Sequence, residues 1–289
     1  MIWIIANPSA GAGRAKARAK VAAICIQKQF KTAQLHFTKS RGDAFKIAKL
    51  AISIGIKRII VCGGDGTLHE TLPALSNTDT ILGILPFGSC NDFARHLRIP
   101  TTTRDAIECC LNGEVKKVDL GKCGSRLFAT VAAVGFDAEV NKIVEKTKSK
   151  KRITTYIGAA LKLLRDYKPR EMSLRGDFGS IKVGAMMVTC ANTNSYGGGL
   201  NIAPHAATDD GMFDICIISS LGKLQAMILL IFLAIGIHTK HPNVRIEKSS
   251  FLEIESESKT TYSLDGEYSN SLPVQFDVVP KALKVIVPI

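Results

Sequence analysis

The stretch 59-IIVCGGDGTLHE-70 decides the fold of the first part of the chain. Its four apolar residues, Ile59–Cys62, are typical of a buried strand and run directly into the glycine-rich segment Gly63–Thr67. Glycines remove side chains where a phosphate must approach the backbone, and the start of a helix offers free N–H groups to an anion. The stretch therefore predicts a strand, a phosphate-binding loop and a helix. A turn capped by Asp65 or Thr67 is the alternative.

On both sides of this stretch, strand-like and helix-like patterns alternate through the first 120 residues. Apolar runs typical of strands occupy 2–6, 34–38, 58–62 and 81–85. The intervening segments 14–30 and 43–55 carry apolar residues at helical spacing. Strands that are apolar throughout and separated by helices indicate a parallel sheet covered on both faces. In such sheets ligands bind beyond the carboxyl ends of the strands.

Each of these strands ends in a loop that is suited to a ligand. The segment 7-NPSAG-11 opens a basic helix, although it is neither the Rossmann nor the P-loop fingerprint, so an ordinary strand–helix turn is the alternative. Thr38 follows the second strand, and 86-PFGS-89 follows the fourth. In this last loop Ser89 is the better candidate ligand, because the residues after it are expected to cap the next helix.

The pattern changes at about residue 120. Short alternating or apolar runs are separated by turns rich in Gly, Asp and Asn, which indicates a mostly antiparallel sandwich or barrel. Helical insertions are expected near 138–166 and 221–237. We therefore predict an α/β domain at 1–119 and a β-rich domain at 120–289. Whether the final run, 283–288, stays in the second domain or crosses back to the first is left open.

The composition restricts the partners. A net charge of +13 and a pI near 9.4 imply an anionic partner. Aromatic residues make up only 6% of the chain and do not alternate with basic ones, which argues against nucleic acid. The eight cysteines form no CxxC pair, which favours reduced thiols in a cytoplasmic protein. The first residues have no basic lead-in and indicate a strand, not a signal peptide.

Two segments bear on membrane contact. The apolar run 226–237 is shorter than the ~20 residues of a membrane span, so a buried helix is the simpler interpretation and an interfacial helix the alternative. The segment 142–156 concentrates Lys and Arg near an apolar stretch, which favours an anionic lipid surface, with a solvated helix face as the alternative. We therefore expect peripheral association with an anionic membrane.

Two acidic turns of the second part are further candidate sites. The segment 209-DDG-211 suits either a hairpin turn or a pair of oxygen ligands for a hard cation. The segment 264-LDGE-267 is a hairpin turn unless another role is shown. None of the six histidines has metal-ligand spacing with another, and no serine nucleophile elbow occurs. Zinc chemistry and covalent catalysis therefore have no support.

Taken in order, six motifs resemble the diacylglycerol kinase catalytic-domain family, which includes bacterial soluble lipid kinases and sphingosine kinases. They are NPSAG, GGDGTLHE, PFGSCNDFAR, VGFDAEV, NSYGGGLNIAPHA-x-x-DDGMFD and LDGE. GGDGT alone is shared with NAD kinases, whereas the later blocks are more specific to lipid kinases. The resemblance covers residues 7–289. It implies a Rossmann-like, NAD kinase/diacylglycerol kinase-like α/β domain followed by a β-sandwich-like domain. It also implies ATP and Mg²⁺ as cofactors.

The activity that the resemblance implies is transfer of the γ-phosphoryl group of ATP to a lipid hydroxyl. Diacylglycerol is the expected acceptor, which gives phosphatidic acid and a role in phospholipid biosynthesis. The motif positions that would line the nucleotide are Asn7, Pro8, Ser9, Ala10, Gly11, Thr38, Gly63, Gly64, Asp65, Gly66, Thr67 and Ser89. Asp265 resembles the general base and Glu267 a nucleotide-side ligand. Asp210, with the backbone carbonyl of Met212, matches a structural Mg²⁺ position.

The sequence departs from the family pattern at one position, and three alternative functions remain open. Where the family pattern is Gly-Thr-Gly-Asn-Asp, this chain has Ser89 and then Cys90, and a side chain at Cys90 stores strain if the position needs positive φ. The alternatives are another lipid acceptor (a sphingoid base, a monoacylglycerol or a polyprenol), an NAD kinase-like soluble kinase, and a weakly active lipid-binding regulatory member. Exposed strand edges of a β-rich domain also permit pairing into a homodimer.

Overall fold

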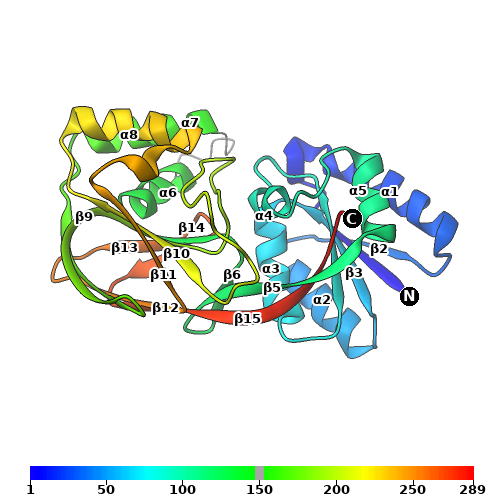
Figure 1. Cartoon of the computed structure of the whole chain (residues 1–289). Coiled ribbons are helices and arrows are strands. Elements are labelled where there is room, and N and C mark those ends of the chain that lie inside the picture. Colours follow the sequence, from blue (N-terminus) through cyan, green and yellow to red (C-terminus); the bar gives the residue numbers. More distant parts are fainter. Residues whose placement is uncertain (147–152) are drawn as a thin grey trace. The chain divides into compact units, whose positions relative to one another are not determined.

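The computed structural model describes residues 1–146 and 153–289. The chain forms two compact units (Figure 1). The first consists of Met1–Asp119 together with Pro280–Ile289, and the second of Leu120–Val279. The final residues therefore return to the first unit. The middle of the basic segment at 142–156 lies outside the described residues.

The first unit contains a parallel sheet. Its strands are β1 (Ile2–Ala6), β2 (Gln34–Phe37), β3 (Arg58–Gly63) and β4 (Ile81–Pro86), in the order β2-β1-β3-β4. The end of β15 (Val274–Val287) adds to the sheet in parallel, with Lys284 opposite Ile81. Every residue of β1 is buried, so both faces of the sheet are covered. The predicted parallel α/β sheet is confirmed.

Helices cover this sheet. They are η1 (Ala10–Gly13), α1 (Ala15–Gln29), α2 (Asp43–Ser53), α3 (Asp65–Leu75), α4 (Asp92–His96) and α5 (Thr103–Asn112). The buried face of α1 is mostly alanine, for example Ala15, Ala19 and Ala22, and it packs with α5 residues in one core cluster. Small side chains there allow the helix to lie close to the strands. The two helices expected from periodicity are α1 and α2.

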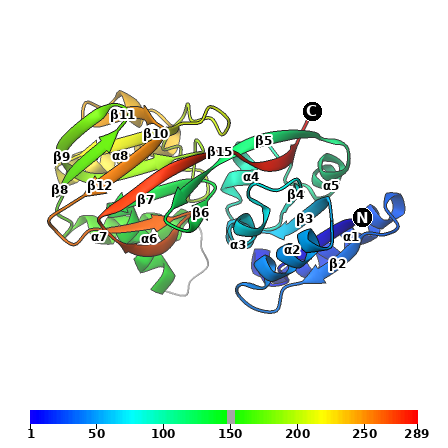
Figure 2. The same cartoon turned by 90° about the horizontal axis from the view of Figure 1, so that it is seen from below.

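The second unit is mainly antiparallel. Strand β5 (Glu114–Cys123) begins in the first unit and ends in the second. The other strands of the second unit are β6 (Arg126–Phe128), β7 (Val131–Gly135), β8 (Arg170–Gly176), β9 (Gly179–Ala191), β10 (Phe213–Ser219), β11 (Val244–Ser249), β12 (Phe251–Glu255), β13 (Thr261–Leu264) and β14 (Glu267–Ser271). They pair in the order β14-β13-β7-β9-β8-β12, and β10 joins β9 to β11. The neighbours β9, β8 and β12 can be followed in Figure 2. The predicted sandwich-like β domain is confirmed.

Helices α6 (Phe136–Lys146), α7 (Ile153–Leu164) and α8 (Lys223–Ile235), with η2 (His238–Lys240), form the predicted helical insertions. They share one core cluster with residues of β7, β9 and β10. A second cluster on the strands centres on three aromatic rings, with Phe128 5.6 Å from Phe213 and 6.0 Å from Phe276 between centroids. Within the described ranges, no helix combines the length and hydropathy needed to cross a bilayer.

Two strand boundaries differ from the sequence pattern. The mostly apolar sequence 127-LFATVAAVG-135 reads as one strand but is broken into β6 and β7, because the backbone of Ala129 and Thr130 donates hydrogen bonds to the side chain of Asp265. The runs at 273–279 and 283–288 are instead one strand, β15. Lys281 adopts φ 52° there, and its N–H donates to the buried carboxylate of Asp119 at 2.6 Å. The backbone N–H at this irregular position therefore has a hydrogen-bond partner, and the strand continues through it.

Candidate active site

Asn7 joins the loop after β1 to the loop after β3. Its backbone N–H donates to the carbonyl oxygen of Cys62 at 3.0 Å, and its side-chain Nδ2 donates to Oγ1 of Thr67 at 3.2 Å. Its Oδ1 accepts the N–H of Ser9 at 3.0 Å. Because one amide side chain satisfies groups of both loops, the backbone path of each depends on the other. Asn7 and Thr67 therefore hold the two loops together.

The loops after β3 and β4 touch through their backbones. The N–H groups of Phe87 and Gly88 donate to the carbonyl oxygen of Gly63 at 2.8 and 3.0 Å. A Cβ atom on Gly88 would lie 2.3 Å from Cα of Gly64, a distance that no real side chain tolerates. Glycine is therefore required at this contact for a packing reason, in addition to any contact with a phosphate.

The loop after β1 rests on the same place. Gly11 has φ 58°, and a Cβ atom there would lie 2.4 Å from the carbonyl oxygen of Phe87. Ala12 shares the left-handed conformation with φ 60°, which is unusual for a residue with a side chain. Three predicted nucleotide loops, after β1, β3 and β4, thus meet at one edge of the first unit's sheet, where the carboxyl ends of the strands lie.

The remaining predicted nucleotide residues lie at the same edge. Asp65 is half-buried as the first residue of α3, and Gly66 beside it is exposed. Gly64 is the N-cap of α3, and no side-chain cap bond is formed, so the capping interpretation of Asp65 and Thr67 is not supported. Thr38 is buried after β2, and its N–H donates to the carbonyl oxygen of Ala6 at 2.9 Å.

The loop 87–91 explains how the chain accommodates Cys90. Asn91 takes the left-handed conformation (φ 53°), and Cys90 is not among the described positions with positive φ. The Asn91 side chain accepts the N–H of Gly88 at 3.0 Å and donates to the carbonyl oxygens of Pro86 and Gly88. The strain considered for Cys90 is therefore absent from its backbone. Ser89 is exposed, as a ligand contact requires.

Asp265 occupies the β13–β14 hairpin turn of the second unit. Leu264 pairs with Glu267, so Asp265 and Gly266 form a two-residue turn in which both have positive φ, 48° and 74°. Asp265 Oδ2 accepts the N–H of Ala129 at 2.9 Å. Its Oδ1 accepts the N–H and the Oγ1–H of Thr130 at 2.8 and 2.6 Å. Three donors therefore fix the orientation of the carboxylate.

A buried amide supports this arrangement from behind. Asn192 is fully buried, its Nδ2 donates to the carbonyl oxygen of Ala129 at 2.8 Å, and its N–H donates to that of Thr130 at 2.8 Å. The loop that holds Asp265 is thus itself held. The supporting roles of Thr130 and Asn192 were not predicted from the sequence. The available signal was that each is a polar residue within or beside a mostly apolar run. Glu267 lies half-buried at the start of β14.

Another buried carboxylate lies close by in the VGFDAEV motif. Asp137 accepts hydrogen bonds from the Tyr196 hydroxyl at 2.9 Å and from Nδ2 of Asn141 at 3.2 Å, and Asn141 also donates to Oγ of Ser263 at 3.0 Å. Burial raises the pKa of Asp137 to about 6, against these hydrogen bonds. Since Ser263 is two residues before Asp265, the cluster braces the strand that leads into the hairpin turn.

The predicted structural Mg²⁺ position contains a cation of its own. Oδ2 of Asp210 lies 2.7 Å from Nζ of Lys248, and Oδ1 accepts the N–H of Met212 at 3.1 Å. Lys248 also lies 3.3 Å from Asp214, which is almost fully buried, and the hydrogen bond to Asp210 raises the pKa of Lys248. A metal ion would have to displace this ammonium group. Across the described residues, no group of three or more acidic, His or Cys side chains is suited to a metal.

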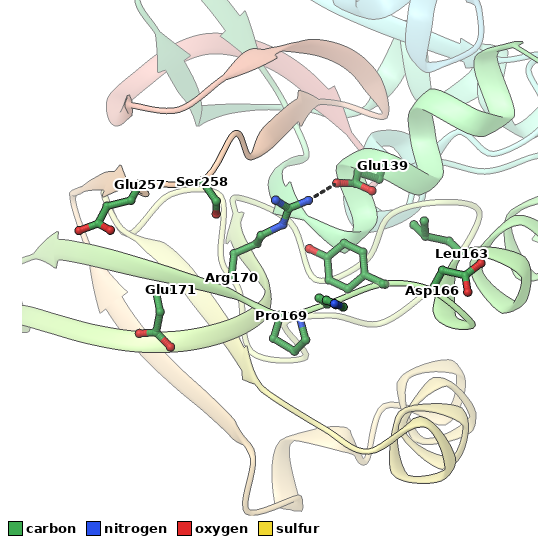
Figure 3. Close-up of a pocket in the computed structure, with 10 residues that line it drawn as sticks. Glu139, Leu163, Asp166, Pro169, Arg170, Glu171, Glu257 and Ser258 are labelled. Carbon is green, nitrogen blue, oxygen red and sulfur yellow. Dashed lines mark hydrogen bonds and ion pairs between the residues drawn. The ribbon is translucent and has the colours of Figure 1, made fainter.

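A cavity of about 580 Å³ in the second unit lies outside the predicted site (Figure 3). Arg170 lies 3.4 Å from Glu139 on its wall, and Asp166, Glu171 and Glu257 also line it. Acidic side chains therefore outnumber basic ones, which disfavours an anionic ligand such as a nucleotide phosphate. None of the predicted site residues lines this cavity.

The fold and these loops define a kinase with an α/β nucleotide unit and a β-sandwich-like second unit. Residues 1–123 match the family model described as the diacylglycerol kinase catalytic domain. Residues 130–287 match the YegS C-terminal NAD kinase beta sandwich-like domain. Diacylglycerol kinases from Staphylococcus aureus strains bovine RF122 and MRSA252 are each 30% identical over 99% of this chain and 91% of theirs.

Solved structures agree with these matches. A Bacillus anthracis strain Sterne protein that is provisionally assigned as a diacylglycerol kinase has a TM-score of 0.85 and 28% identity, covering 99% of this chain and 94% of that one. A second structure so assigned from the same strain has a TM-score of 0.83 and 27% identity, with 99% and 96% covered. The chain belongs to the diacylglycerol kinase catalytic-domain family and is a lipid kinase. ATP use follows from membership of a kinase family.

Proposed function

We propose that the protein transfers the γ-phosphoryl group of Mg²⁺-bound ATP to the free hydroxyl of diacylglycerol and so forms phosphatidic acid. The observation that carries the proposal is Asp265, a carboxylate fixed by three hydrogen bonds at the tip of a two-residue turn. Phosphoryl transfer needs positioned groups and charge neutralisation more than covalent catalysis. A rigid acceptor for one proton is the side chain that such a reaction requires.

In this proposal the loops of the first unit bind the nucleotide. Gly11, Gly64 and Gly88 allow the three loops to meet without side chains between them. Exposed Ser9, Gly66 and Ser89, with half-buried Asp65, are among the groups of this edge that a triphosphate can reach. Asn7 and Thr67 position the loops, because their side chains bond to each other. Mg²⁺ would neutralise charge on the phosphates, and Asp65 is the acidic residue of these loops that could orient its water ligands.

Asp265 acts on the acceptor in the same proposal. The lipid hydroxyl donates a hydrogen bond to the carboxylate of Asp265, whose orientation is fixed by Ala129 and Thr130. As the hydroxyl oxygen bonds to the γ-phosphorus, the bond from that phosphorus to the β–γ bridging oxygen breaks. The hydroxyl proton passes to Asp265 late in the step, and ADP leaves. Glu267, on the same hairpin, is proposed to face the nucleotide.

We further propose that the protein works in the cytoplasm, associated peripherally with an anionic membrane that supplies the lipid. The net charge of +13 supports attraction to such a surface. Phosphatidic acid formed there would enter phospholipid biosynthesis.

A substrate panel tests the proposed function. Labelled ATP is supplied with diacylglycerol, a monoacylglycerol, sphingosine, undecaprenol or NAD, with and without Mg²⁺. The proposal expects labelled phosphatidic acid as the dominant product, and only with Mg²⁺ present. Labelling of NAD alone, or preferential labelling of another lipid, contradicts it. Binding of lipid and nucleotide without turnover would indicate a regulatory member of the family.

A further inference from the structure

Helix α8 is apolar around most of its circumference, and its polar residues, Lys223 and Gln225, lie in the first turn. One stripe, Ala226, Leu229 and Leu233, is buried in the core cluster that it shares with α6 and α7. The opposite stripe is also apolar and consists of Leu224, Met227, Ile228, Ile231 and Ile235. A helix on the surface of a soluble domain normally has a polar outer side. The outer side of α8 therefore lacks the residues that water favours.

The outer stripe is strongly exposed. Leu224 is 72% exposed, and Ile231 and Ile235 are each 63% exposed. These three residues follow the i, i+7, i+11 spacing of one helical face, so they form a continuous ridge and are not scattered apolar residues. Contiguous apolar surface of this kind marks an interaction site.

Helix α7 extends the apolar surface. Ile157 and Leu161, one turn apart, are 45% and 46% exposed, while Ala160 and Leu164 of the same helix are buried in the cluster that also holds α8. Figure 1 shows α7 and α8 along the same side of the second unit. The two helices contact each other, and we name their exposed apolar residues together the α7–α8 face.

Basic side chains predominate around this face. Neither α7 nor α8 contains an acidic residue. Lys162 and Arg165 are exposed, and Arg165 follows Leu161 by one helical turn; Lys223 is exposed at the start of α8. Exposed Asp166 follows Arg165 and is an acidic neighbour of this face, so the balance of these four charges is positive. Apolar side chains with an excess of cations beside them match the boundary of an anionic bilayer, where acyl chains lie beneath negatively charged headgroups.

We propose that the α7–α8 face docks on an anionic lipid bilayer, with the outer stripe of α8 inserted among the acyl chains. The proposal rests on the lipid-kinase function and names the surface through which the protein reaches its lipid. A second copy of the chain fits this face less well. A twofold contact of the face with itself would bring the same cations, Lys162, Arg165 and Lys223, toward one another. An anionic bilayer neutralises them.

The test compares two variants with matched changes. The first carries Leu224→Gln, Ile231→Gln and Ile235→Gln, which remove apolar surface but retain helix-forming residues. The control carries Ile24→Gln, Leu50→Gln and Ile54→Gln, which alter three apolar residues of similar exposure in the first unit. Co-sedimentation is measured with vesicles of phosphatidylcholine alone and with 30% phosphatidylglycerol, a probe composition of roughly the anionic content that the argument requires. Circular dichroism checks folding.

The wild type and the control should bind the anionic vesicles, and the triple variant should bind at least about tenfold more weakly, since each large side chain contributes roughly tenfold. Equal binding of all three proteins overturns the proposal. So does a wild-type dimer that the triple variant converts to monomer without any change in vesicle binding, because the face would then pair two copies.

A water-soluble, short-chain diacylglycerol separates docking from catalysis. The triple variant should phosphorylate this monomeric substrate as fast as the wild type does, but lose activity on vesicle-bound diacylglycerol. If the wild type does not phosphorylate the soluble substrate, the proposed function is wrong, whereas vesicle sedimentation still decides the docking surface.

Discussion

The two candidate site regions of this kinase, the nucleotide loops and the Asp265 hairpin, depend on different chemical groups: backbone in the first and a side chain in the second. The nucleotide loops of the first unit depend on backbone, because Gly11, Gly64 and Gly88 permit contacts that a single Cβ atom would prevent. The hairpin of the second unit depends on a side chain, since Asp265 is held by three donors of Ala129 and Thr130. One region is sensitive to added atoms and the other to a changed functional group.

This difference explains why the departure at Cys90 is acceptable. The loop after β4 needs a left-handed residue, but that residue is Asn91, whose side chain also bonds to the loop. A side chain at Cys90 therefore leaves the backbone path intact. A comparable change at Asp265 would leave three donors without their acceptor, which is costly for groups that are shielded from water.

The largest effect is expected for Asp265→Asn. Loss of the proton acceptor should reduce kcat for lipid phosphorylation by about 10²- to 10⁴-fold, the usual contribution of a general base. ATP binding, measured by calorimetry, should change little, because the proposed contact of Asp265 is with the hydroxyl of the acceptor and not with the nucleotide. Thr130→Val is the companion variant: it removes one hydrogen bond, keeps the carboxylate, and should lower kcat by only about tenfold. Equal losses in both variants would indicate a structural role for Asp265.

The next effect concerns pH and the buried carboxylate of Asp137. Its pKa is raised in the folded state to about 6, above the value of 3.8 in an exposed group, so the folded state retains the proton as pH rises. The free energy of unfolding should therefore fall as the pH rises from 4 to 7. The expected fall is about 3 kcal/mol, because the pKa of Asp137 differs by ~2 units between the folded and unfolded states. In Asp137→Asn this loss should be absent. Urea unfolding at both pH values measures it, with exposed Asp166→Asn as control; parallel profiles for the wild type and Asp137→Asn contradict the assignment.

Added atoms test the nucleotide loops. Gly88→Ala places a methyl group against Cα of Gly64 and should reduce the free energy of unfolding by about 1–3 kcal/mol and weaken ATP binding. Gly158→Ala, in α7, adds the same methyl group where no atom lies within 4 Å and should stabilise by up to about 1 kcal/mol. Thermal and urea unfolding compare the pair. If Gly88→Ala unfolds like the wild type and binds ATP normally, the backbone contact between Gly88 and Gly64 does not determine the structure of the nucleotide loops.

The smallest effect is expected for Cys90→Gly. Because Cys90 is outside the left-handed region, glycine relieves no strain there, and KM for ATP should stay within about twofold of wild type. Asn91→Ala should have the larger effect, since it removes three hydrogen bonds of the loop. Steady-state kinetics on both variants decides this point. A gain of tenfold or more in kcat for Cys90→Gly would instead show that the natural sequence attenuates the enzyme.

Much of the first unit was predictable because its signals are local. An apolar strand that ends in glycines and a helix, as at Ile59–Thr67, fixes strand direction and places the loop at the ligand edge. The β13–β14 turn was predictable for the same reason, because Asp265-Gly266 is a favoured hairpin pair.

Contacts between distant residues were not predictable. The return of β15 to the first unit depends on pairing with β4, about 200 residues earlier in the chain. The support of Asp265 by Thr130 and Asn192 joins three separate segments. The Lys248–Asp210 ion pair likewise links two strand ends that carry no shared motif. Such contacts appear only when the fold brings the segments together.

One measurement tests the central claim most directly: transfer of label from γ-labelled ATP to a short-chain diacylglycerol by wild type and Asp265→Asn, side by side. The account predicts labelled phosphatidic acid from the wild type and a loss of at least about 100-fold in the variant while the variant still binds ATP. Absence of labelled lipid from the wild type, or an equal rate in the two proteins, would contradict it.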